Sequence, residues 1–289
     1  MARKSYPLSA SRLDRAGIAF VEHHYYTPVV FPSDIRFPLD QTRNIAGLDL
    51  NEALQLTILD SFSYHDELLK IPVEPTGARE YYYKNGWFEE GDGEYLYNMI
   101  RYFKPRRIVE IGSGFSTLMA RRAIIQNQRE DNDYACAHVC IEPFEHPWLD
   151  NLDVQMLRTK VEDSPESVFK ELTKNDILYI DSSHVIRPQG DVLYEYLQLL
   201  GGLAPGVIVH VHDIFTPRDY LEEWVLRDRR MWNEQYLLEA FLCFNTAFEV
   251  IGALNWLTHE HRDKLEKACP QLMRNPNAEP RSFWFRRVS

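Results

Sequence analysis

The segment RIVEIGSGFST, residues 107–117, contains the pattern that decides the fold. RIVEI is a short apolar run that predicts a strand, and the helical run STLMARRAIIQNQ follows at 116–128. Between them, Gly112 and Gly114 mark a tight turn, and their missing side chains let a ligand approach the backbone. A purely structural turn is the alternative interpretation.

Strands and helices alternate along the rest of the chain. The predicted helices lie near 164–173, 190–200 and 232–244. The other predicted strands are 137–142, 154–157, 177–181, 206–213, 247–252 and 282–288. Alternation at this spacing predicts an α/β fold, with a doubly wound, mainly parallel seven-stranded sheet and helices on both of its faces.

The first ninety residues have a different sequence pattern. Prolines and aromatic residues are scattered through them, and a helical periodicity is present only at 48–69. We expect residues 1–92 to form an N-terminal arm and helical extension that acts as a lid, and residues 93–289 to form the catalytic domain. The aromatic cluster Tyr81–Tyr83, Trp87 and Phe88 in this extension is read as packing rather than as a substrate platform, although both roles stay open.

Composition excludes several classes of protein. The 289 residues are 45% hydrophobic and carry a net charge of −11 with no basic run, which argues against binding to a nucleic-acid backbone. No apolar stretch is long enough to span a membrane, and no apolar block follows the N-terminal charges as in a secretory signal. The expected location is the cytoplasm, where the four cysteines stay reduced.

Acidic residues gather where the predicted strands end, which is where ligands bind in sheets of this kind. They are Glu110, Glu142, the neighbours Glu162 and Asp163, Asp181, and Asp213. Such a rim favours a cofactor with hydroxyls and an amine, or a metal ion, over a bare phosphate. Glu142 can accept hydrogen bonds from two ribose hydroxyls. Thr117 stands where a dinucleotide-binding fingerprint has its third glycine, which counts against a nicotinamide cofactor.

In this combination of motifs, the chain resembles class I S-adenosylmethionine-dependent methyltransferases, and more narrowly methyltransferase family 24. The resemblance extends over roughly residues 80–289 and is carried by VEIGSGFST (109–117), IEPF (141–144), DILYIDSSH (176–184) and PGVIVHVHDIF (205–215). It implies a Rossmann-like domain that binds S-adenosylmethionine.

The resemblance also implies roles for single residues. Those expected to contact the amino-acid part of the cofactor or to open the following helix are Glu110, Gly112, Ser113, Gly114, Ser116 and Thr117. Glu142 would bind the ribose, and either Asp163 or Glu162 would lie near the adenine amine. Asp181 is counted with the cofactor residues as well as with the catalytic ones.

Asp181, His184, His212 and Asp213 close two apolar strands whose ends are expected to be neighbours. Two carboxylates and an imidazole suit a divalent cation, so Asp181, His212 and Asp213 are the predicted metal ligands, with His184 left as general base. The arrangement resembles metal-dependent sugar O-methyltransferases, which have Glu-Asp where this chain has His212-Asp213. That departure puts the metal in doubt. His210 faces the same way as His212, so either histidine is a candidate for simple packing.

The leading hypothesis is an enzyme that transfers a methyl group from S-adenosylmethionine to a hydroxyl of a small-molecule or glycosyl acceptor, with metal assistance as an option. The alternatives are a non-catalytic module that binds the same cofactor and, more remotely, an NAD-dependent oxidoreductase. The expected partners are the acceptor and a second copy of the chain, without nucleic acid.

Overall fold

A computed structural model describes residues 15–17, 23–77, 79–144 and 146–289. The chain divides into two compact units. The smaller unit combines residues 1–41 with residues 220–231, and the larger unit contains residues 42–219 and 232–289. Residues 42–92, assigned by sequence to the N-terminal extension, therefore fall in the larger unit together with the sheet. Their function as a lid stays a prediction.

The larger unit is built on a seven-stranded sheet with the order β3-β2-β1-β4-β5-β7-β6. Strands β1 to β5 run parallel, and β7 is antiparallel to both of its neighbours. The strands are β1 (Arg107–Ile111), β2 (Ala137–Ile141), β3 (Gln155–Leu157), β4 (Ile177–Ile180), β5 (Ile208–Val211), β6 (Phe248–Ala253) and β7 (Phe283–Arg287). The α/β, mainly parallel sheet expected from the sequence is confirmed.

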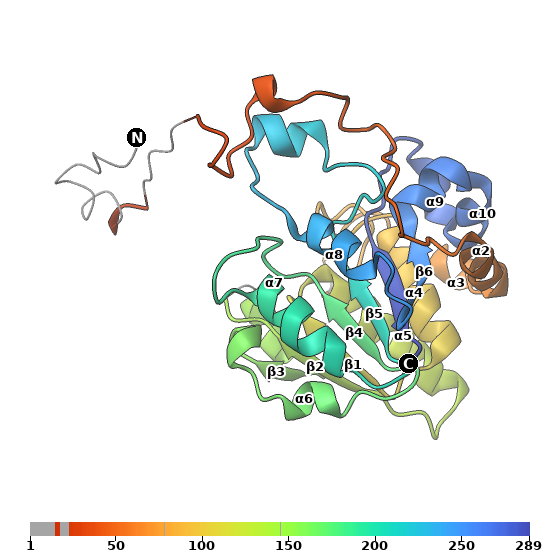
Figure 1. The fold of residues 1–289 in the computed structure, drawn as a ribbon. Helices are drawn as coiled ribbons and strands as arrows, with labels where there is room; N and C mark the ends of the chain where they lie inside the picture. Colours follow the sequence, from red (N-terminus) through yellow and green to blue (C-terminus); the bar gives the residue numbers. More distant parts are fainter. Residues whose placement is uncertain (1–14, 18–22, 78, 145) are drawn as a thin grey trace. The chain divides into compact units, whose positions relative to one another are not determined.

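Helices cover both faces of this sheet (Figure 1). One face packs against α2 (Glu52–Ser61), α4 (Asp92–Phe103), α5 (Phe115–Glu130), α9 (Leu254–Glu260) and α10 (Arg262–Ala268). The other packs against α6 (Ser167–Lys170), α7 (Asp191–Tyr194), which continues into a π-helical turn, and α8 (Glu234–Leu242). Because both faces are covered, the central strands are buried on both sides and most of their residues are apolar.

Some elements differ in length from their sequence patterns. The helix expected over 164–173 is a single turn, α6, preceded by the 3₁₀ turn η3 (Val161–Asp163). The helical pattern at 48–69 divides into α2 and α3 (His65–Leu68). Asn51 does precede α2, but with left-handed backbone angles and without a side-chain capping bond. These segments are short because the helices pack against the sheet over only part of the amphipathic pattern.

Within the described part of the chain, no helix combines the length and apolar character that a membrane crossing requires.

Candidate functional site

A cavity of about 250 Å³ opens at the carboxyl ends of the parallel strands. Residues that follow β1, β2, β3 and β4 line it, together with the start of α7. The lining residues are Ile111, Gly112, Ile141, Glu142, Pro143, Phe144, Lys160, Val161, Glu162, Asp181, Ser182, Ser183, Arg187 and Asp191. The cavity lies where the strand order reverses, between β1 and β4, and this is the standard ligand position in doubly wound sheets.

The turn after β1 requires glycine at position 112. Gly112 has φ of +75°, and a Cβ atom there would lie 1.9 Å from the carbonyl oxygen of Asp181. Any side chain would therefore push β1 and β4 apart at the cavity wall. Gly114 has φ of −176°, which any residue adopts, and an added Cβ would meet only the His146 ring at 3.4 Å. Backbone geometry therefore fixes only the first glycine of the pair.

Glu110 points away from the cavity. Its carboxylate is buried under the first turn of α5, where it accepts hydrogen bonds from Ser116 Oγ at 2.5 Å and Thr117 Oγ1 at 2.6 Å. His138 Nε2 lies 3.2 Å away from the same carboxylate. Thr117 Oγ1 also accepts the backbone N–H of Gly114. These side chains fix the turn from below, so none of Glu110, Ser116 and Thr117 lines the cavity.

Glu142 closes β2 at the cavity wall and is buried. Its Oε1 accepts the backbone N–H of Phe144 at 2.8 Å, and its Oε2 lies 3.4 Å from the backbone nitrogen of Ser113. Of the two acids that the sequence left open after β3, Glu162 lines the cavity, whereas Asp163 is exposed and does not.

Asp181, His184 and Asp213 come together beside this cavity, after β4 and β5. His184 Nε2 lies 3.2 Å from Asp181 Oδ1 and 3.4 Å from Asp213 Oδ2. One ligand atom from each residue falls within 4.8 Å of the others, so the three suit a metal ion. His184 and Asp213 both have left-handed backbone angles, with φ of 60° and 57°. Such conformations cost energy in residues other than glycine and cluster at functional sites.

Glu234, at the start of α8, holds the other side of the His184 ring. Its Oε2 lies 2.8 Å from His184 Nδ1, and both residues are buried. Burial alone would lower the pKa of His184, but the contacts with Asp181 and Glu234 raise it well above its ordinary value. Burial alone would raise the pKa of Asp181, but His212 and His184 lower it to about 2. The carboxylates around His184 therefore stabilise the positive imidazolium that it forms on taking up a proton.

His212 and His210 occupy a buried aromatic layer behind these acids. The His212 ring lies 5.3 Å from Phe88 and 5.6 Å from His210, and His210 stacks on Tyr179 at 3.9 Å. His212 Nε2 is 3.7 Å from Asp213 Oδ1, but His212 does not belong to the metal-like cluster. Burial lowers the pKa of His210. The geometry brings Asp181, Asp213 and His184 together and leaves His212 at their edge.

Sequence reasoning missed two side chains of this site. Glu234 and Arg281 lie far along the chain from β4, and no motif pairs them with it. Arg281 Nε lies 2.5 Å from Asp213 Oδ1, on the approach to β7. The one available signal was that each is a charged residue at or just before the start of a predicted element.

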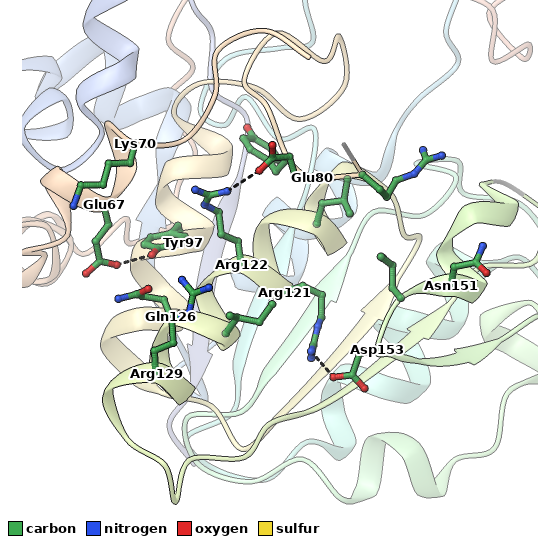
Figure 2. A pocket seen from close by; sticks show the side chains of 15 residues that line it. Glu67, Lys70, Glu80, Tyr97, Arg121, Arg122, Gln126, Arg129, Asn151 and Asp153 are labelled. Atoms are coloured by element: carbon green, nitrogen blue, oxygen red, sulfur yellow. Dashed lines mark hydrogen bonds and ion pairs between the residues drawn. The ribbon is translucent and has the colours of Figure 1, made fainter. Parts of the chain in front are cut away.

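A second, larger cavity of about 530 Å³ lies against the outer face of α5 (Figure 2). Its charges are largely paired: Arg121 with Asp153 at 2.5 Å, and Arg122 with Glu80 at 3.3 Å. Glu67 accepts the Tyr97 hydroxyl in the same groove. This groove shares no residue with the cavity at the strand ends, and its described lining contains no serine, threonine, cysteine or histidine.

Comparison with known proteins points to one family. A family model described as a methyltransferase domain matches residues 109–214. An uncharacterized protein of Archaeoglobus fulgidus is 30% identical over 174 residues, which cover 56% of this chain and 77% of that protein. A solved structure of a loganic acid methyltransferase with SAH covers 75% of this chain and 99% of its own, at 9% identity and a TM-score of 0.34, too low to inform the site.

Proposed function

The chain belongs to the class I S-adenosylmethionine-dependent methyltransferases of the family 24 type, and from this premise we propose that it methylates a hydroxyl oxygen of a small-molecule or glycosyl acceptor. The observation that supports oxygen as the target is the buried His184, which has a carboxylate behind it and faces two more at the cofactor cavity. A hydroxyl must lose a proton during methylation, and this group is placed to receive it.

The residues of the strand-end cavity fit S-adenosylmethionine, which supplies the methyl group when bound. Glu142 offers a buried carboxylate at the position of the ribose hydroxyls, and Glu162 offers one toward the adenine amine. The bare backbone of Gly112 leaves room for close approach, and the buried Ser113 hydroxyl has no hydrogen-bond partner among the described residues. These features support the assignment of Gly112, Ser113, Glu142 and Glu162 to cofactor binding.

His184 acts as the general base in this proposal. Its Nε2, which lies beside Asp181 and Asp213, would take the hydroxyl proton, while Glu234, at 2.8 Å from Nδ1, would fix the tautomer and the ring orientation. The positive imidazolium that forms is stabilised by Asp181, Asp213 and Glu234. Most of the rate acceleration would come from holding the acceptor oxygen in line with the methyl group.

Asp181 and Asp213 would hold a divalent cation, which would supply positive charge that lowers the pKa of an acceptor hydroxyl. His184 would stay free to take the proton, and a pair of carboxylates suits an oxygen-preferring cation such as manganese or magnesium. The cation is a second part of the proposal and stands apart from the role of His184.

The test is methyl transfer from radiolabelled S-adenosylmethionine to a panel of glycosides and small alcohols, with and without EDTA. We expect His184→Ala to lower turnover by about 10²–10⁴-fold with little change in affinity for S-adenosylhomocysteine. Full activity of the wild type in EDTA would show that no cation takes part in the reaction, and His184 would then act alone. Binding of S-adenosylhomocysteine without transfer to any acceptor would instead indicate a non-catalytic binding module. Binding of NAD in its place would indicate an oxidoreductase.

A further inference from the structure

Trp87 has surroundings unlike those of the other five tryptophans. The residue is 68% exposed, and its indole makes no ring, cation or hydrogen-bond contact with any of the described residues. The others each contact a ring or a guanidinium group: Trp148 with Arg79, Trp224 with Arg230, Trp232 with His184, Trp256 with His261 and Trp284 with Tyr95. Tryptophan is enriched at binding surfaces because its large ring loses much apolar area to a ligand.

The backbone under Trp87 is held firmly by Asn85. The Oδ1 atom of Asn85 accepts the backbone N–H groups of Trp87 at 2.9 Å and Phe88 at 2.8 Å. Its Nδ2 donates to the carbonyl oxygens of Tyr82 at 2.8 Å and Phe88 at 2.7 Å. Gly86, with φ of +80°, closes the turn. The backbone that carries the exposed ring is therefore ordered before any ligand binds, which lowers part of the cost of binding.

The same turn is attached to the proposed catalytic centre at two points. Arg281 Nη2 donates to the Trp87 carbonyl oxygen at 3.0 Å, while Arg281 Nε lies 2.5 Å from Asp213 Oδ1. On the inner side, the Phe88 ring lies 5.3 Å from the His212 ring and 6.1 Å from the Tyr179 ring. Trp87 is thus the sequence neighbour of Phe88, which packs against His212 and Tyr179. Its carbonyl oxygen is also linked to Asp213 through Arg281.

From this arrangement we infer that Trp87 is the platform on which the methyl acceptor stacks, and that the acceptor presents a saturated, hydroxylated ring. The indole face carries negative charge density and packs against the C–H face of such a ring. The ring's hydroxyls would then reach Asp181 and Asp213, which accept hydrogen bonds. This inference rests on the proposed function and adds a residue that determines which acceptor is used. The adjacent Tyr81, Tyr83 and Phe88 are buried and serve packing.

The kinetic test uses Trp87→Ala, Trp87→Phe and the control Phe244→Ala on the full chain. Phe244 is 81% exposed and follows α8, so it matches Trp87 in exposure but lies outside the site. With methyl hexopyranosides as acceptors, we expect Trp87→Ala to raise KM about tenfold, which corresponds to about 1.4 kcal/mol, with kcat within about twofold. Trp87→Phe restores most of the affinity, and Phe244→Ala changes neither constant. An unchanged KM in Trp87→Ala overturns the inference.

A second measurement is independent of turnover. The difference between the fluorescence spectra of the wild type and Trp87→Phe reports Trp87 alone, and methyl hexopyranosides should quench or shift that emission. A response to catechol but to no glycoside overturns the saturated ring, and a response to neither overturns the platform. If glycosides perturb Trp87 in a wild type that transfers no methyl group, the platform stands and the proposed reaction fails.

Discussion

Glu162 and Asp163 show how two neighbouring carboxylates after a strand acquire different surroundings, one at the cavity and one in solvent. Glu142 and Glu162 both line the cofactor cavity, whereas Asp163 is exposed. The sequence left Glu162 and Asp163 as equal candidates because a one-residue shift in a loop reverses which side chain faces inward. In the structure, the 3₁₀ turn η3 begins at the buried Val161, and the side chain that it directs to the cavity is that of Glu162.

We expect Glu142→Ala to weaken S-adenosylhomocysteine binding by about tenfold or more, because hydrogen bonds to a charged acceptor contribute about 1.5–3 kcal/mol each. Glu162→Ala should weaken binding less, and Asp163→Ala should leave it unchanged. Isothermal titration calorimetry on the three variants measures this order. A larger loss in Asp163→Ala than in Glu162→Ala would show that η3 is turned differently when the cofactor binds.

The orientation of the His184 ring depends on Glu234, which lies 2.8 Å from its Nδ1. Glu234→Gln keeps the volume of the side chain but removes the charge that faces Nδ1. We expect kcat to fall by about ten- to a hundredfold with unchanged affinity for S-adenosylhomocysteine, because an orienting carboxylate acts on the base and not on the cofactor. The matched control is Glu239→Gln, another buried acid of α8, which accepts the Thr216 hydroxyl and does not contact His184. Equal losses in both variants would indicate a general effect of buried charge on the fold.

At the scale of elements, the strands were predictable and the polar contacts between elements were not. The composition of RIVEI and ILYI predicts buried strands, since parallel strands covered on both faces are mostly apolar. Glu110 belongs to the same motif as Gly112, yet its side chain serves α5. Strand alternation gives opposite directions to neighbouring residues, but which face holds the ligand depends on packing that a linear pattern does not contain.

Helix α4 is joined to the C-terminal segment by Glu94. Its Oε1 accepts the backbone N–H of Gln271 at 2.7 Å, and its Oε2 accepts those of Gly91 at 3.1 Å and Leu272 at 3.2 Å. Burial raises the pKa of Glu94 from 4.5 to about 8, although these backbone donors lower it. Between those two pH values the folded protein keeps a proton that the unfolded chain releases. Its contribution to the free energy of unfolding therefore falls as pH rises through this window.

Glu94→Gln removes this titration and places an amide NH₂ against backbone donors. We expect the variant to be less stable than the wild type at pH 5, by about 1–3 kcal/mol, and the gap to narrow as the pH rises toward 8. Chemical denaturation at several pH values measures the gap, and Glu260→Gln, an exposed acid on α9, serves as control. A gap independent of pH would mean that Glu94 is ionised throughout, held by its three backbone donors.

At the scale of the whole molecule, the proposed catalytic centre is assembled from segments that are distant in sequence. Asp181 follows β4, Asp213 follows β5, Glu234 begins α8 and Arg281 precedes β7. The sheet order brings β4, β5 and β7 side by side, so their ends meet. The neighbouring ends of β4 and β5 could be expected from the alternating pattern. The positions of α8 and β7 could not, because strand order beyond β5 depends on how the chain returns to the sheet after α9 and α10.

This convergence predicts a metal-dependent change in the stability of the whole fold. Asp181 Oδ1, His184 Nε2 and Asp213 Oδ2 approach one another only when β4 and β5 are paired, so the unfolded chain has no such site. A cation at a hundred times its Kd would stabilise the folded state by about 2.7 kcal/mol, which raises Tm by several degrees in a chain of this size.

We expect Mn²⁺ to raise Tm in the wild type and EDTA to reverse the shift, whereas Asp213→Asn should show almost no shift. Comparing shifts within each variant removes the effect of losing the Arg281 contact on Tm itself. Asp163→Asn, which removes an exposed acid outside the cluster, should respond as the wild type does. Equal shifts in Asp213→Asn and the wild type would place any bound cation elsewhere, and the three side chains would then serve only the proton transfer at His184.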